Sequence, residues 1–120
     1  MSSIKSYKEL LVWQKSIELV KEIYLQTELF PADEKFGLTS LIRRSVISIP
    51  SNIAEGWGRM SRKNYIQFLR ISRGSLFELE TQIIISKELK YCTYSENIDS
   101  LIIEISKMLN SLIKKLEEKQ

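Results

Sequence analysis

The residues best suited to chemistry are arginines, and they are gathered in one stretch of the chain. Every arginine lies between residues 43 and 73, where Glu55 is the only acidic residue. The basic side chains of this window are Arg43, Arg44, Arg59, Arg62, Lys63, Arg70 and Arg73. Arginine offers a planar fork of donors that fits phosphate or carboxylate oxygens. The window therefore predicts a local anion-binding surface, with RNA or DNA as the candidate partner.

Composition excludes most catalytic and metal chemistry. The chain contains no histidine, which removes Ser-His-Asp and Cys-His catalysis and the zinc and di-iron sites of helical proteins that need it. It contains no GxxxxGK[ST] phosphate loop, and Gly56-Trp57-Gly58 lacks the third glycine of a dinucleotide fingerprint and reads as a helix stop. We therefore expect a protein that is not an enzyme, with no catalytic residue, metal site or cofactor.

Length and composition predict one helical domain over residues 1–120. The chain has 43% apolar residues, 4 glycines and 2 prolines, which is too few turn-forming residues for an all-β domain. Its longest charge-free run, residues 45–54, is about half of the roughly 20 residues that a membrane span needs, so no membrane association is expected. The start of the chain has no secretory pattern, and the single cysteine, Cys92, fits a reducing cytoplasm.

Apolar spacing predicts four helices, at about residues 8–27, 36–57, 61–90 and 95–118, and hence an all-α, up-down antiparallel four-helix bundle. In the first helix the expected buried seam follows a 3-4-3-4 spacing. Its members are Leu10, Trp13, Ile17, Val20 and Tyr24.

The second helix contains Pro50, which predicts a kink, because proline removes one backbone hydrogen bond and its ring clashes with the preceding turn. The serines near it, Ser45, Ser48 and Ser51, could satisfy the freed backbone groups. Asn52 and Glu55 form a structural polar motif on the same helix, closing the kink or pairing with arginine. In the third helix, Gly74 predicts close approach of another helix.

The fourth helix has a wider apolar face than one neighbour would cover. One row contains Ile98, Leu101, Ile105, Met108 and Leu112, and a second contains Ile102, Leu109, Ile113 and Leu116. The width has two interpretations, either burial between two neighbours of its own bundle or contact with another subunit.

The basic residues of the third helix fall on one side of it at about 100° per residue, beside its apolar face. We call Arg62, Lys63, Arg70 and Arg73 the basic stripe. Side chains spread over several turns could contact phosphates at several points. The alternative is a solvated face whose cations pair with acidic residues of the first and fourth helices.

Several segments of the chain are similar to one known family. They are Leu11–Ser16, Phe30–Pro31, Glu34–Leu38, Arg43–Ser45, Ser48–Gly56 and Phe68–Leu79, within a region of about residues 7 to 94. They resemble the four-helix-bundle proteins encoded by intervening sequences of bacterial 23S ribosomal RNA genes, often labelled S23 ribosomal proteins.

The resemblance implies an up-down four-helix bundle. It extends to the accessory variability determinant of diversity-generating retroelements, a ring-shaped homopentamer that binds nucleic acid and a reverse transcriptase. Carried over by position, it implies a basic surface at Arg43, Arg44, Arg59 and Arg73, and a polar motif at Asn52 and Glu55. The family usually has Leu-Gly-Tyr after the third helix, where this chain has Leu89-Lys90-Tyr91.

We therefore expect a cytoplasmic homo-oligomer, a pentamer by resemblance, that binds RNA or DNA through its arginine-rich face. The second interpretation is an oligomeric scaffold for a partner protein, such as a reverse transcriptase, whose arginines make subunit and partner contacts without nucleic acid. An open basic surface favours the first interpretation. Arginines neutralised by acidic residues across an interface favour the second.

Overall fold

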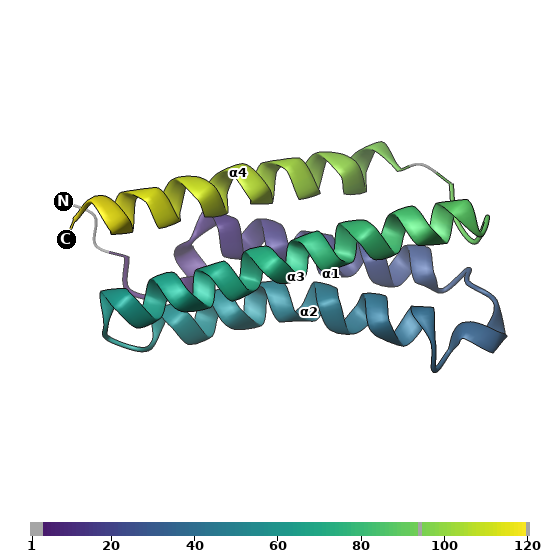
Figure 1. The fold of residues 1–120 in the computed structure, drawn as a ribbon, viewed down its shortest axis with the longest axis horizontal. Coiled ribbons are helices and arrows are strands. Elements are labelled where there is room, and N and C mark those ends of the chain that lie inside the picture. The colour runs from purple at the N-terminus through teal and green to yellow at the C-terminus, as the bar shows by residue number, and fades with distance from the viewer. Residues whose placement is uncertain (1–3, 94, 120) are drawn as a thin grey trace.

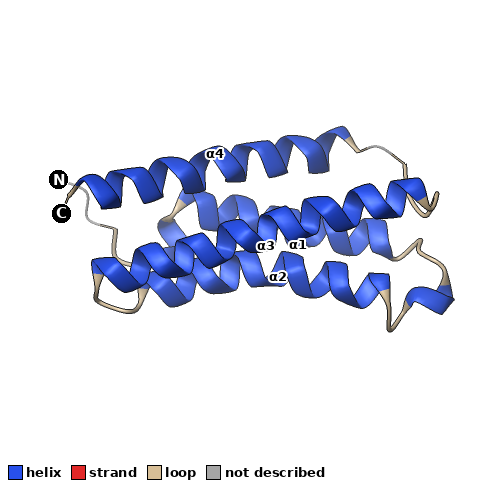
Figure 2. Ribbon diagram, viewed as in Figure 1, coloured by secondary structure: helices blue, strands red, loops and turns tan. Residues whose placement is uncertain are grey.

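Four antiparallel α-helices make up the bundle (Figure 1). A computed structural model describes residues 4–93 and 95–119 of the chain. The helices are α1 (Leu11–Thr27), α2 (Leu38–Trp57), α3 (Arg62–Glu88) and α4 (Glu96–Glu118), with short 3-10 helices η1 (Tyr7–Glu9) and η2 (Ala32–Glu34) before α1 and α2. Within these residues Figure 2 shows only helices and loops. The all-α, up-down four-helix bundle expected from the sequence is confirmed.

Each helix packs against two others. Consecutive helices contact one another, and α4 closes the bundle by contacting α1 as well as α3. The approach of α2 to α3 is tight at Gly56, where an added Cβ would lie 2.7 Å from the Cβ of Phe68. Gly56 lies within α2 and allows α3 to pack closely against it, whereas Gly58 is the C-cap residue of α2. Within the chain, the expected close approach at Gly74 is absent from the described residues, because an added Cβ there would meet nothing within 4 Å.

The buried face of α1 differs from the expected seam. Its buried residues are Val12, Ser16, Leu19, Ile23 and Thr27. Ser16 and Thr27 can be buried because their hydroxyls donate to the carbonyls of Val12 (2.7 Å) and Ile23 (2.8 Å) of the same helix. Four residues of the expected seam, Leu10, Trp13, Val20 and Tyr24, are partly buried and pack against the edge of the core, so the seam is confirmed in part and the fully buried row lies beside it. Ile17, in the expected seam, is 41% exposed.

The wide apolar face of α4 is used within the chain. Ile98, Leu101 and Ile105 of one row and Ile102, Leu109 and Ile113 of the other are all buried. Since α4 contacts both α1 and α3, each row has a neighbour in the same bundle. The first of the two sequence-based interpretations is therefore correct for this face.

Helix α2 continues through Pro50. The predicted use of Ser45, Ser48 or Ser51 is wrong, because none of these described hydroxyls donates to the carbonyl of Val46, which Pro50 leaves without its usual backbone donor. Near the proline, a hydroxyl of α3 reaches a different carbonyl: Ser72 donates to that of Ile49 at 2.9 Å. Ser48 instead shares a hydrogen bond with Ser75 of α3 at 2.7 Å. Small hydroxyl residues on facing helices therefore hold α2 and α3 together at the proline.

Candidate nucleic-acid interface

The structure separates the basic residues into two groups. Arg43 and Arg44 lie near the start of α2, whereas the others lie around the α2–α3 turn and along the first half of α3. At 1.5 Å per residue, Arg44 lies about 20 Å along α2 from the α2–α3 turn. Helix α3 runs back along α2, and Ser72, next to Arg73, contacts Ile49, so Arg73 lies only about 8 Å from Arg44 along the bundle axis.

Arg43 is committed to the contact between α1 and α2. Its Nε donates to Thr27 Oγ1 at 2.9 Å, its Nη2 donates to the carbonyl of Tyr24 at 3.3 Å, and its guanidinium carbon lies 4.3 Å from the centre of the Tyr24 ring. The same Tyr24 carbonyl also accepts the backbone N–H of Glu28 at 3.2 Å, so Arg43 adds a further donor at the end of α1. Arg44 is exposed and makes no hydrogen bond or ion pair with a residue that the structure describes.

Arg59 is held on the surface by Glu55. Its Nη2 and Nε lie 2.8 and 3.0 Å from Glu55 Oε2, and its guanidinium carbon lies 4.9 Å from the centre of the Phe68 ring. Asn52 has a different role, because its Nδ2 donates to the carbonyl and hydroxyl of Ser48, both at 2.8 Å. The two residues of the expected polar motif therefore act separately, Asn52 within the α2–α3 contact and Glu55 through an arginine.

Three arginines of the basic stripe reach across to α4. Arg62 Nη1 donates to the carbonyl of Lys119 at 2.6 Å, Arg73 Nη1 donates to Asn110 Oδ1 at 2.9 Å, and Arg70 forms an ion pair with Glu117. Only the last of these contacts involves a carboxylate. Lys63 is exposed, and no described residue pairs with it. The stripe therefore has one neutralised position among the described contacts and keeps most of its positive charge.

The start of α3 and the end of α4 lie at the same end of the bundle (Figure 1). A groove lies between them, along the first three residues of the stripe, Arg62, Lys63 and Arg70. It has a volume of about 710 Å³. Its lining residues are Arg62, Lys63, Asn64, Ile66, Gln67, Arg70 and Glu117. The groove therefore presents cations and side-chain amides beside a single carboxylate, a donor set that suits phosphate oxygens. We call it the α3–α4 groove.

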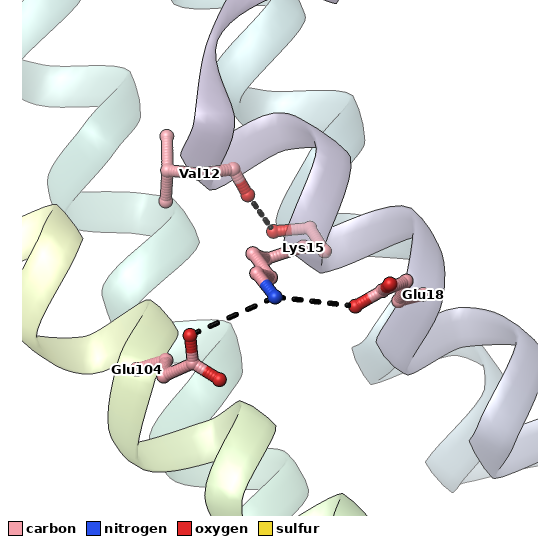
Figure 3. Close-up of polar contacts among 5 residues, drawn as sticks. Val12, Lys15, Glu18 and Glu104 are labelled. Carbon is pink, nitrogen blue, oxygen red and sulfur yellow. Dashed lines mark hydrogen bonds and ion pairs between the residues drawn. The ribbon is translucent and has the colours of Figure 1, made fainter.

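On the α1–α4 side, one lysine lies near two carboxylates. Figure 3 shows Lys15 of α1 between them, with its Nζ 3.7 Å from Glu18 Oε2 and 3.7 Å from Glu104 Oε2. The same side also carries Lys107 and Lys115, which line a pocket with no carboxylate among its described lining residues. The excess of carboxylates on this side is therefore local to Lys15.

Asn64, Gln67 and Glu117 were not singled out from the sequence. Gln67 lies between Lys63 and Arg70 at 4-3 spacing, so extending the basic stripe to uncharged donors would have found it. Asn64 adjoins Lys63 in the first turn of the same helix. Glu117 carries no such signal, because it meets α3 only through the rotation of α4 in the folded bundle.

Other chemistry finds little support among the described residues. No group of three or more Cys, Asp or Glu side chains in residues 4–93 and 95–119 is placed to hold a metal ion. Over the same residues, no helix combines the length and apolarity that crossing a bilayer requires. Cys92 is half-buried, and burial raises the pKa of its thiol, which disfavours the reactive thiolate.

Comparison with known proteins matches the chain to one family by sequence and to solved structures by fold. The family model described as 23S rRNA-intervening sequence protein matches residues 8–111. A crystal structure of a protein of unknown function from the S23 ribosomal protein family of Bacteroides thetaiotaomicron VPI-5482 is 31% identical, with a TM-score of 0.78, over 87% of this chain and 96% of that chain. No curated protein matches the chain.

Proposed function

The chain belongs to the family of 23S rRNA-intervening sequence proteins, and from its charge arrangement we propose that it is a non-enzymatic protein that binds RNA or DNA. The observation that carries the proposal is the α3–α4 groove, where Arg62, Lys63 and Arg70 lie beside the side-chain amides of Asn64 and Gln67. The family name alone refers to a gene location and assigns no ligand. The ligand is inferred from the chemistry of the groove.

The phosphate backbone is the part of a nucleic acid that such a groove fits. Its donors come from successive turns of one helix, so they can contact phosphates in series, and phosphate contacts carry no base information. Tyr65 and Phe68 are half-buried beside the core and offer no open stacking platform. We therefore expect binding with weak sequence selectivity and a steep dependence on salt.

Self-association is the second part of the proposal. With the wide face of α4 buried inside the chain, the support comes from apolar side chains on other surfaces. Phe77 and Ile84 of α3 and Ile103 of α4 are 52%, 55% and 50% exposed. Large apolar groups left half-exposed near one another are typical of protein contact sites. A cytoplasmic homo-oligomer accommodates these groups, and the pentamer remains the expectation from resemblance.

The same apolar residues support the alternative function, an oligomeric scaffold that docks a partner protein such as a reverse transcriptase. The scaffold function does not require binding to polyanions at physiological salt, whereas the nucleic-acid-binding function does require it. Titration of labelled duplex DNA, single-stranded RNA and an RNA hairpin at about 50 and 200 mM salt separates the two functions. We expect binding that falls steeply between the two concentrations. Absence of binding to all three probes at both concentrations contradicts nucleic-acid binding and leaves the scaffold.

A further inference from the structure

We infer that Glu117 occupies a phosphate subsite of the α3–α4 groove, so that the last turn of α4 competes with nucleic acid for Arg70. The inference rests on the proposed function and concerns the regulation of that site. Among the described residues, Glu117 is the only carboxylate that lines the groove, and it is paired with Arg70. A carboxylate and a phosphodiester use the same guanidinium donors, so both cannot hold this arginine fully at once.

The pair is placed where a ligand can displace it. The side chains of Arg70 and Glu117 are 46% and 41% exposed. Exposed ion pairs add little to stability, because water solvates the separated partners nearly as well. A phosphate that binds Arg70 can also contact Lys63 and Gln67, which line the same groove. It can therefore replace the Glu117 carboxylate without unfolding α4.

The same turn of α4 also occupies a second arginine. Arg62 donates to the carbonyl of Lys119, one of the carbonyls at the end of α4 that lack a partner within the helix. Both contacts come from the final residues of the last helix, and both use donors that point toward the groove. The end of α4 thus lowers the affinity of the groove for polyanions while no ligand is bound.

The adjacent residue provides a matched control. Glu118 carries the same charge, is exposed and makes no hydrogen bond or ion pair with a described residue. Glu117→Gln and Glu118→Gln therefore change the net charge equally, and only the first releases Arg70. A general electrostatic effect acts on both variants alike, whereas competition for Arg70 acts on one.

The test measures the dissociation constants of wild-type protein, Glu117→Gln and Glu118→Gln for labelled duplex DNA and a labelled RNA hairpin at one salt concentration. We expect Glu117→Gln to bind about two- to fivefold more tightly than Glu118→Gln, a factor equivalent to the loss of one exposed ion pair. In an Arg70→Gln background, the difference between the two variants disappears, since Glu117 acts through that arginine.

Three results overturn the inference. Equal affinities of Glu117→Gln and Glu118→Gln, while wild-type protein binds, reject competition and leave nucleic-acid binding in place. Weaker binding by Glu117→Gln shows that the carboxylate positions Arg70 for the ligand instead of competing with it. Absence of binding by every variant to both probes rejects the proposed function, and the subsite with it.

Discussion

Tyr91 donates a hydrogen bond from its hydroxyl to Glu34 Oε2 at 2.8 Å. The second oxygen of the same carboxylate accepts the backbone N–H of Leu38 at 3.0 Å. Glu34 thus caps the first turn of α2, whose N-cap residue, Gly37, has no side chain to do so. One carboxylate thereby joins the start of α2 to the connection between α3 and α4.

This contact predicts how stability depends on pH. The Leu38 N–H, followed by the Tyr91 hydroxyl, lowers the pKa of Glu34 below the ordinary glutamate value of 4.5. A carboxyl whose pKa is lower in the folded state stabilises the fold above its unfolded pKa and loses that contribution as the pH falls through the folded value. The melting temperature of the wild type should therefore exceed that of Glu34→Gln at pH 7, by a margin that shrinks below about pH 4.5. A margin that stays constant down to pH 2 contradicts this role.

The end of α3 predicts a stabilising substitution. Lys90 has a φ of 63°, and the N–H groups of Lys90 and Tyr91 donate to the carbonyls of Lys87 (3.0 Å) and Ser86 (2.9 Å). This is the Schellman arrangement, which normally uses glycine at the left-handed position. Lys90→Gly should raise the free energy of unfolding by about 1 kcal/mol, measured by urea denaturation. Lys90→Ala keeps the backbone strain and removes the charge, so it should change the free energy of unfolding little. An equal gain in both variants would instead assign the effect to the loss of the lysine charge.

Two glycines in helices should respond in opposite directions to the same substitution. At Gly56 a new Cβ meets Phe68 Cβ at 2.7 Å and the carbonyl of Tyr65 at 3.3 Å, whereas at Gly74 it meets nothing within 4 Å. Gly56→Ala should cost about 1–3 kcal/mol by overpacking. Gly74→Ala should gain about 1 kcal/mol of helix propensity. Denaturation of the two variants side by side measures both, and a loss in Gly74→Ala would reveal a close contact of α3 with another molecule.

Asn52 and Glu55 should differ in their effect on stability. The Asn52 amide donates to Ser48 within the half-buried α2–α3 contact, so Asn52→Ala should lower the free energy of unfolding by about 1–2 kcal/mol. The ion pair of Glu55 and Arg59 is about half-exposed, so Glu55→Ala should lower the free energy of unfolding by less than about 1 kcal/mol. Chemical denaturation gives both values, and the reverse order would place the structural role on Glu55.

The fold was largely predictable from the sequence because α2, α3 and α4 each present apolar residues at helical spacing. The orientation of α1 was predictable only in part: most of the expected seam packs at the edge of the core, but the fully buried row includes Ser16 and Thr27, whose polar side chains give no apolar signal. The basic residues of the site were visible as a charge cluster. Their partners were not, because the pairing of Arg70 with Glu117, 47 residues away, depends on how α4 is rotated against α3.

The central claim is that the α3–α4 groove binds nucleic-acid phosphates, and charge reversal of its two arginines together with Arg73 of the basic stripe tests it most directly. The triple variant Arg62→Glu, Arg70→Glu and Arg73→Glu is compared with Lys21→Glu, Lys35→Glu and Lys90→Glu, an equal charge change at exposed lysines elsewhere. We predict that the arginine variant loses binding to duplex DNA and hairpin RNA, with helical content and oligomeric mass unchanged. The lysine variant should retain binding with a log–log salt slope near that of the wild type. Equal losses in the two variants, or loss of the assembly in the arginine variant with no binding by the wild type, would contradict the claim.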